Sequence, residues 1–242
     1  HAMGSSARIT APEQWTASPV ETLSRQESRQ CGPGAQRWPV SADELCQGLR
    51  RNQLRLAFQP MVPLRRSLSA CFEVRGHLRN SRGTVAWKSL RTAAAARGLA
   101  EALDQALIRS SLAWLRKGEF NTLVLIVNLS LAALHSKRFA PWLASQLQDG
   151  PHPRNRLVLQ FYEADLQAAP DSLPDFCAAI SELQMTLAIR HFSASDDSFP
   201  LLSRFPFTQV TLDPARLGNL EADQGQFAAL EALIKQLHAQ HI

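Results

Sequence analysis

The order of apolar and polar positions predicts secondary structure along most of the chain. Ser41 precedes the segment ADELCQGLRRN, and Glu44 lies three residues after Ser41, an arrangement typical of a capping box that opens a helix. The segments LRLAFQP (54–60) and ACFEV (70–74) have the composition and alternation of strands. Leucines recur at helical spacing over residues 86–117, which predicts a helix there.

The second half of the chain repeats strand and helix in turn. The continuous apolar run LVLIVNLS (123–130) is too short for a buried helix and therefore predicts a fully buried strand. Further strands are expected at 157–162, 186–192 and 207–213. Helices are expected over 131–148 with a break at Pro141, over 172–184, shortly after residue 192, and over 227–240. This alternation indicates an α/β fold with a parallel sheet, either open or closed into a barrel.

Polar residues gather where the predicted strands end. They are Gln59, Glu73, Asn128, Gln160 with Glu163, His191 and Asp213. No Gly-rich phosphate loop follows a predicted strand, which argues against a dinucleotide-binding fold. Polar residues at the ends of many strands are typical of the active-site face of a barrel, so the pattern favours the barrel.

The chain divides into an irregular start and one domain. Residues 1–5 (HAMGS) are typical of a cloning scar. Residues 6–40 are rich in Ser, Pro, Gln and Gly without apolar periodicity, so we expect a linker or flexible tail that leads from another domain into the domain at 41–242. No apolar run approaches the roughly 18 residues of a membrane span. The four cysteines lack metal-ligand and CxxC spacing, which favours reduced thiols in a cytoplasmic protein.

Charge is distributed unevenly within a net charge of +5. The stretch from Arg50 to Lys117 holds fourteen Lys and Arg against three Asp and Glu, a balance of +11, whereas the chain from Gly118 onward has a balance of −5. A stretch this basic either is a solvated surface or docks an acidic partner. It lacks the interleaved aromatic residues of a nucleic-acid platform, so we expect no nucleic-acid binding.

Six short motifs stand at the predicted strand ends and can be compared with known families. They are FQPMV (58–62), CFEV (71–74), VNLS (127–130), LVLQFYEADL (157–166), TLAIRHFSAS (186–195) and VTLD (210–213). In order and spacing they resemble the "YQPIV", "EAL", "VNLS", "LELEITES", "VAIDDFGTG" and "VKID" motifs of the EAL family of cyclic-di-GMP phosphodiesterases. The segments FEV and FYEAD resemble its non-catalytic branch, which includes type IV pilus regulators.

The resemblance spans residues 42–240 and implies an EAL-type (β/α) TIM-like barrel. The family has two more strands beyond the position of Ile242, so the resemblance implies a barrel whose last two strands are missing from this chain. It also implies a site in which carboxylates and an Asn hold two divalent cations that activate a water. The relic metal-site positions are Glu73, Asn128, Gln160, Glu163, Arg190, His191, Thr211 and Asp213.

Several of these positions depart from the family pattern. Gln160 stands in place of a Glu, Arg190 and His191 in place of paired Asp residues, and Thr211 in place of a Lys that positions the water. The changes at Gln160, Arg190 and His191 make the site about four charges more positive, and an inward Arg190 would repel a divalent ion by several kcal/mol at an effective dielectric of about 20. We therefore expect no metal, no cofactor and no enzymatic activity.

Two hypotheses of function follow. The first is a catalytically inactive regulatory domain that acts through contacts with another protein, or with an upstream domain, in bacterial cyclic-di-GMP-linked signalling such as motility or type IV pilus control. The alternative is a receptor that binds cyclic di-GMP without hydrolysing it. A receptor should keep a phosphate-binding cation at the barrel mouth, whereas an adaptor need not. The positions that the resemblance places beside a nucleotide are Gln59, Pro60, Arg75, His77 and Arg79, with His77 where the family has a phosphate-binding Arg.

Overall fold

A computed structural model describes residues 40–64, 69–80, 83–117, 122–148, 154–213 and 224–242. The predicted scar at 1–5 and all but the last residue of the predicted tail at 6–40 lie outside the described residues, as does Cys31. The predicted capping box is confirmed, because Ser41 Oγ accepts from the amide of Glu44 at 3.1 Å and Glu44 Oε2 accepts from the amide of Ser41 at 2.8 Å.

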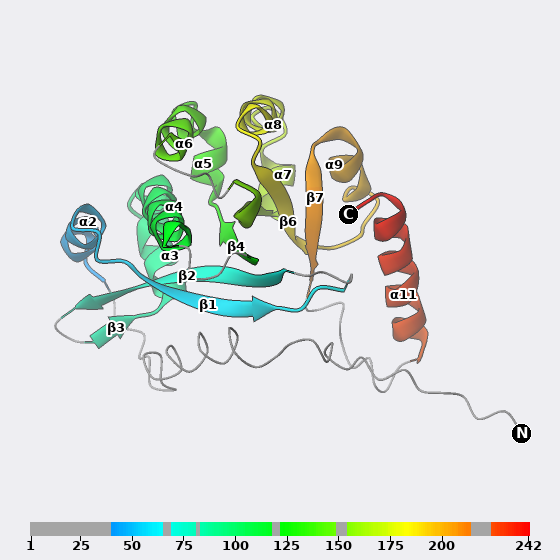
Figure 1. Ribbon diagram of the computed structural model, residues 1–242, viewed down its shortest axis with the longest axis horizontal. Helices are drawn as coiled ribbons and strands as arrows, with labels where there is room; N and C mark the ends of the chain where they lie inside the picture. Colours follow the sequence, from blue (N-terminus) through cyan, green and yellow to red (C-terminus); the bar gives the residue numbers. More distant parts are fainter. Residues whose placement is uncertain (1–39, 65–68, 81–82, 118–121, 149–153, 214–223) are drawn as a thin grey trace, which may run out of the picture.

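A curved sheet forms the centre of the molecule (Figure 1). Its strands run in the order β1-β2-β4-β5-β6-β7, and β3 pairs with β2 outside this path. Among the described residues, β1 and β7 are therefore the two edges. The strands are β1 (Arg55–Met61), β2 (Ala70–Asn80), β3 (Gly83–Val85), β4 (Leu123–Asn128), β5 (Leu157–Tyr162), β6 (Thr186–Phe192) and β7 (Phe207–Leu212).

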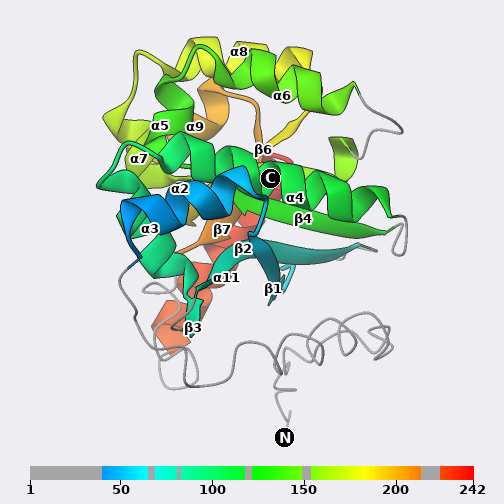
Figure 2. The same cartoon turned by 90° about the vertical axis from the view of Figure 1, so that its left-hand side faces the viewer.

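Helices cover the outer face of this sheet. In Figure 1, α4, α6, α8 and α9 follow one side of the sheet, and α11 stands beside β7. Figure 2 shows α6 and α8 side by side, in agreement with their contacts. The helices are α2 (Ala42–Arg50), α3 (Trp87–Ala95), α4 (Ala100–Arg116), α5 (Leu131–His135), α6 (Phe139–Leu147), α7 (Glu163–Ala168), α8 (Leu173–Glu182), α9 (Phe199–Arg204) and α11 (Gln224–Ala239). None of the helices in the described part of the chain has the length and apolar character needed to cross a bilayer.

The predicted parallel sheet is confirmed for four strand pairs of the main path and not for the first one. β1 and β2 are antiparallel, whereas β2-β4, β4-β5, β5-β6 and β6-β7 are parallel. The two predicted strands are separated by only nine residues, and a parallel crossover needs about a dozen or more. β2 also runs further than predicted and forms a hairpin with β3, which the sequence pattern did not reveal.

The predicted helical stretch 86–117 is two helices, α3 and α4. The chain turns at Gly98, whose φ of +65° lies in the left-handed region that glycine adopts without steric cost. The amide of Leu99 then donates to the carbonyl of Ala94 at 2.8 Å, which satisfies one of the last carbonyls of α3. This break matters for the site, because it lets α3 take its own direction relative to α4.

The predicted break at Pro141 is also displaced. α5 ends at His135 and α6 begins at Phe139, so Pro141 lies in the first turn of α6. In the first turn a residue without an amide hydrogen loses no intrahelical bond, and proline is tolerated there. A further short helix, α7, begins directly after β5 and was not predicted.

The alternation of side chains along each strand separates two apolar clusters. The larger one contains outward-facing residues such as Leu125, Leu159 and Leu187 together with the helices. The smaller one contains Ile126 and Val158, with Ala188, on the opposite, inner face of the sheet. Because side chains two residues apart share a face, the inner face continues past this small cluster into the polar strand ends.

Candidate functional site

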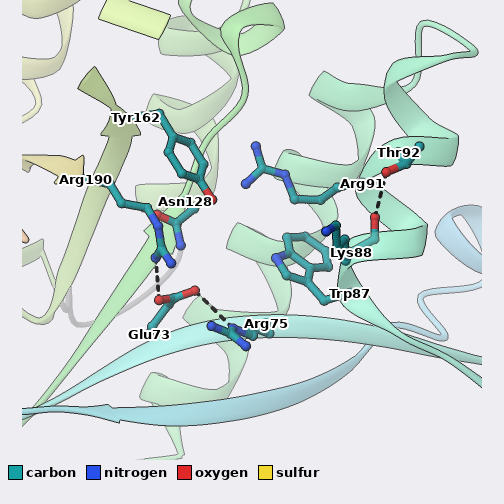
Figure 3. Close-up of a pocket in the computed structure, with 9 residues that line it drawn as sticks. All are labelled: Glu73, Arg75, Trp87, Lys88, Arg91, Thr92, Asn128, Tyr162 and Arg190. Carbon is teal, nitrogen blue, oxygen red and sulfur yellow. Dashed lines mark hydrogen bonds and ion pairs between the residues drawn. The ribbon is translucent and has the colours of Figure 1, made fainter. Parts of the chain in front are cut away.

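A cavity of about 480 Å³ opens at the polar strand ends (Figure 3). It lies between the inner face of β2, β4, β5 and β6 on one side and α3 on the other. Its lining comprises four cationic side chains, one carboxylate, two aromatic rings and two small polar groups. These residues are Glu73, Arg75, Trp87, Lys88, Arg91, Thr92, Asn128, Tyr162 and Arg190.

Two arginines hold the carboxylate of Glu73. Arg190 donates from Nη1 to Oε2 of Glu73, and Arg75 donates from Nε to Oε1 at 3.1 Å. The side chain of Glu73 is 5% exposed and that of Arg190 13%, whereas that of Arg75 is 40% exposed. A buried carboxylate requires such partners, because an unpaired charge in the interior loses its hydration.

Tyr162 lies between two guanidinium groups. Arg190 Cζ is 5.3 Å and Arg91 Cζ is 5.4 Å from the centre of its ring. At this distance a cation over an aromatic face is attracted by the ring quadrupole. The stack therefore joins a residue of β6, the end of β5 and α3 into one wall of the cavity.

His191 is the extra residue of a β-bulge. Arg190 pairs with Thr211 and Phe192 with Leu212, so β6 contributes one more residue than β7 between these pairs. His191 has a φ of +54° and meets the ring of Tyr162 edge-on at 5.2 Å. A bulge changes the direction of the side chains that follow it. Arg190, which precedes the bulge and lies two residues after the inner-face Ala188, lines the cavity, while His191 lies outside its lining.

Gln160 and Thr211 form a neutral hydrogen bond with each other, at the two positions where the sequence resemblance places a Glu and a Lys. Gln160 Nε2 donates to Thr211 Oγ1 at 2.8 Å. The two side chains span β6, where the register partner of Gln160 is the small Ala188. The pair contributes no charge to the site.

Glu163 is used as a structural acceptor. Its Oε2 accepts from the backbone amide of Ser193 at 2.7 Å, which ties the start of α7 to the segment after β6. Its Oε1, like Asn128 Oδ1 and Gln160 Oε1, is buried without a hydrogen-bond partner among the described residues. Buried oxygens of this kind are ordinarily satisfied by ordered water.

The residues present do not fit a pair of divalent cations. Glu73 is neutralised by two arginines, Gln160 is uncharged, and the guanidinium of Arg190 occupies the cavity. Within the described part of the chain, no group of three His, Cys, Asp or Glu side chains could hold a metal ion. Hard cations need several anionic oxygens, so this arrangement opposes their binding.

The nucleotide-side positions are only partly brought to the cavity. Arg75 lines it, and Gln59 is the antiparallel register partner of Glu73 on the exposed strand β1. Pro60 and Arg79 are exposed and do not line it. His77 is buried away from the lining, and burial, followed by the charge of Arg55, lowers its pKa. Asp213 is half-buried just after β7.

The α3 side of the cavity was missed by the sequence reasoning. Trp87, Lys88, Arg91 and Thr92 all come from this helix, and positions i, i+1, i+4 and i+5 share one side of a helix. The sequence feature that could have indicated this is the apolar pair Leu90 and Ala94, four residues apart. Both are fully buried, so they show which side of α3 faces the core and, next to it, which side faces the cavity.

The buried Asp104 holds the segment that follows β4. Asp104 on α4 accepts from the amide of Ser130 at 2.8 Å and from its hydroxyl at 2.5 Å, and so fixes the segment that follows Asn128. Burial raises the pKa of Asp104 to about 7, against the opposing effects of the Ser130 hydrogen bonds and of Arg91.

Comparisons with known proteins agree with this fold. A family model described as "EAL domain" matches residues 42–242. The solved FimX EAL domain from Pseudomonas aeruginosa bound to c-di-GMP is 30% identical with a TM-score of 0.74, over 81% of this chain and 80% of that one. The Xanthomonas citri FimX EAL domain in complex with c-diGMP is 18% identical with a TM-score of 0.73, over 92% of this chain and 82% of that one.

A curated relative is much longer than the matched segment. It is the uncharacterized protein y4lL of Sinorhizobium fredii, which is 26% identical over 199 residues, or 82% of this chain. The matched part is 24% of the length of that protein, so this chain spans about a quarter of it.

Proposed function

This chain belongs to the EAL domain family, and from that premise we propose that its domain binds cyclic di-GMP in the cavity of Figure 3 without hydrolysing it. The observation that carries the proposal is the charge of the lining. Arg75, Lys88, Arg91 and Arg190 stand against the single carboxylate of Glu73, a balance of +3. This meets the requirement of the receptor hypothesis for a cation at the barrel mouth.

The chemistry of the cavity matches that of a cyclic dinucleotide. Such a ligand has two singly charged phosphodiesters and two purine rings. The net charge of +3 opposes the charge of the phosphodiesters, and the ring of Trp87 supplies a stacking face for a purine. The FimX EAL domain of Pseudomonas aeruginosa, at 30% identity, is bound to c-di-GMP, which supports the same ligand class for this chain.

The absence of hydrolysis is part of the proposal and rests on the Glu73 arrangement. Hydrolysis in the family requires two metal ions that activate a water. Here the guanidinium of Arg190 pairs with Glu73 inside the cavity. A positive group in that position repels divalent cations and satisfies the carboxylate that would bind them.

Calorimetric titration with cyclic di-GMP, in EDTA and in Mg²⁺, tests the proposal. We expect cyclic di-GMP to bind saturably, with the same affinity in EDTA and in Mg²⁺. Chromatography of the mixture should show no linear dinucleotide, the product of hydrolysis. Binding that requires Mg²⁺, or the absence of binding in both buffers, would contradict it.

Contact with another protein or an upstream domain, the first of the two hypotheses from the sequence, is the second candidate function, as the output step of signalling. Val62 and Leu64, directly after β1, are large apolar residues that are 67% and 51% exposed. Exposed apolar side chains beside a sheet edge favour a protein contact. Replacing both with Ser should abolish capture of a signalling partner while cyclic-di-GMP affinity stays unchanged. Equal capture by this variant would exclude these two residues from the contact.

The proposed setting is the bacterial cytoplasm. Cys46, Cys71 and Cys177 are free thiols, the state that thiols keep in a reducing compartment. Fractionation of cells that express the whole protein, followed by immunoblotting, checks this location.

A further inference from the structure

We propose that α3 supplies the ligand-binding wall of this site: Arg91 and Lys88 pair with a phosphodiester, and Trp87 stacks on the adjoining purine. This assignment rests on the proposed function and deepens it. It gives α3 the phosphate-binding role that the sequence resemblance places at position 77 on β2.

The cations of β2 and β6 are already engaged. Arg190 and Arg75 both donate to the carboxylate of Glu73. His77 does not line the cavity, and its lowered pKa keeps its ring neutral at neutral pH, so it offers no positive charge to a phosphate. Among the described lining residues, the positive charges that no carboxylate binds directly are therefore Lys88 and Arg91.

Arg91 is held in place for a ligand. Its guanidinium stacks over Tyr162 at 5.4 Å and makes no hydrogen bond to any described residue, so its donors stay available. The acids near it are Asp165 at the start of α7 and the buried Asp104 on α4; burial raises the pKa of each, and the charge of Arg91 opposes that rise. The guanidinium is therefore positioned by the Tyr162 ring, a contact that uses none of its hydrogen-bond donors.

The helix behind these side chains is firmly packed. Leu90 and Ala94 are fully buried, and α3 contacts β2, α2 and α4. Figure 3 shows Trp87 and Arg91 projecting from α3 toward the side of the cavity that carries Glu73, Tyr162 and Arg190. A site held on a packed helix loses little freedom when a ligand binds.

The spacing of Trp87 and Arg91 suits one nucleotide. Residues four apart on a helix have Cβ atoms about 5–6 Å apart, which matches a ring and its neighbouring phosphate in order of size. An indole face is a good stacking surface for a purine, and stacking on an aromatic side chain contributes to nucleotide binding independently of base identity. The wall therefore recognises the charge and the ring, and it does so without a metal.

Titration of four variants with cyclic di-GMP over a range of ionic strengths tests this wall. Arg91→Met should weaken binding by about 10- to 100-fold, the effect of losing a charge-assisted hydrogen bond, and should reduce the dependence of affinity on salt. Arg91→Lys should recover part of the loss, and Lys88→Met and Trp87→Leu should each weaken binding. The matched control is Lys137→Met, an exposed charge outside the cavity, which should leave affinity and salt dependence unchanged.

The possible outcomes separate the two proposals. If the wild-type chain binds and both Arg91→Met and Lys88→Met bind equally well with an unchanged salt dependence, α3 has no phosphate-binding role and the proposed function stands. If the wild-type chain does not bind, the proposed function fails and this assignment fails with it. Thermal unfolding reports whether each variant is folded. Lys88 is exposed, so its variant keeps the test decisive should Arg91→Met not fold.

Discussion

Arg190 on β6 pairs with Glu73 on β2, although two strands separate them in the sheet. Both side chains lie on the inner face, and the curvature of the sheet brings them together across the cavity (Figure 3). The guanidinium thus occupies the part of the site where the family resemblance places an Asp and a metal ion. The contact links two non-adjacent strands of the sheet, and it leaves the carboxylate of Glu73 unavailable to bind a metal cation.

Removal of this contact should destabilise the fold. In Arg190→Met the carboxylate of Glu73 keeps only the more exposed Arg75, so we expect the free energy of unfolding in urea to fall by about 2–3 kcal/mol. Arg75→Met should cost less than about 1 kcal/mol because its pair is partly exposed. Adding Glu73→Gln to Arg190→Met should recover part of the loss, and no recovery in this double variant would argue against the pairing as the cause.

Divalent cations should not bind the wild-type site. A ligand that binds the folded state raises the unfolding temperature, so millimolar Mn²⁺ should leave the thermal midpoint unchanged. The triple variant Gln160→Glu, Arg190→Asp and His191→Asp adds three carboxylates and removes one guanidinium, which makes the site about four charges more negative, and it should gain a Mn²⁺-dependent rise. A Mn²⁺-dependent rise in the wild type that Arg190→Met does not alter would show that the guanidinium does not exclude metal.

The stability of the fold should depend on the protonation of Asp104. Its pKa is raised from 3.8 to about 7, so the folded state binds this proton more tightly than the unfolded state. The stabilising contribution is complete below about pH 4 and is lost as the pH rises through about 7. Relative to Asp104→Asn, the free energy of unfolding of the wild type should therefore fall by at most about 4 kcal/mol over this window. Parallel pH curves for the two proteins would rule out a raised pKa at Asp104.

The turn between α3 and α4 should require Gly98 because of its backbone conformation, and not because a larger side chain would lack space. A Cβ at Gly98 would meet no atom within 4 Å, but its φ of +65° is unfavourable for other residues. Gly98→Ala should lower the free energy of unfolding by about 1 kcal/mol, and Gly98→Asn by less, because Asn tolerates this region better. Urea denaturation measures the free energies of unfolding of the two variants and the wild type. An Ala variant as stable as the wild type would mean that the turn can adopt another backbone conformation without cost.

Much of the fold follows from local pattern in the sequence. The strands at 123–130, 157–162, 186–192 and 207–213 were found within a few residues of their observed bounds, because buried strands of a parallel sheet are continuous apolar runs between turn residues. The antiparallel first pair, the β2-β3 hairpin and the division of 86–117 were not found, since each depends on chain reversals that composition marks weakly.

The sequence by itself determined the residue types at the strand ends, including Gln160, Arg190 and Thr211 in place of charged family residues, and the two-residue period of strands fixed their shared face. Only the tertiary structure decided which of these groups meet. Sheet curvature sets the distance between non-adjacent strands, so the pairing of Arg190 with Glu73 has no local signal. The packing of Leu90 against the core turns α3 so that Trp87 and Arg91 enter the cavity, because the direction of a helix face is fixed by its contacts with the rest of the fold.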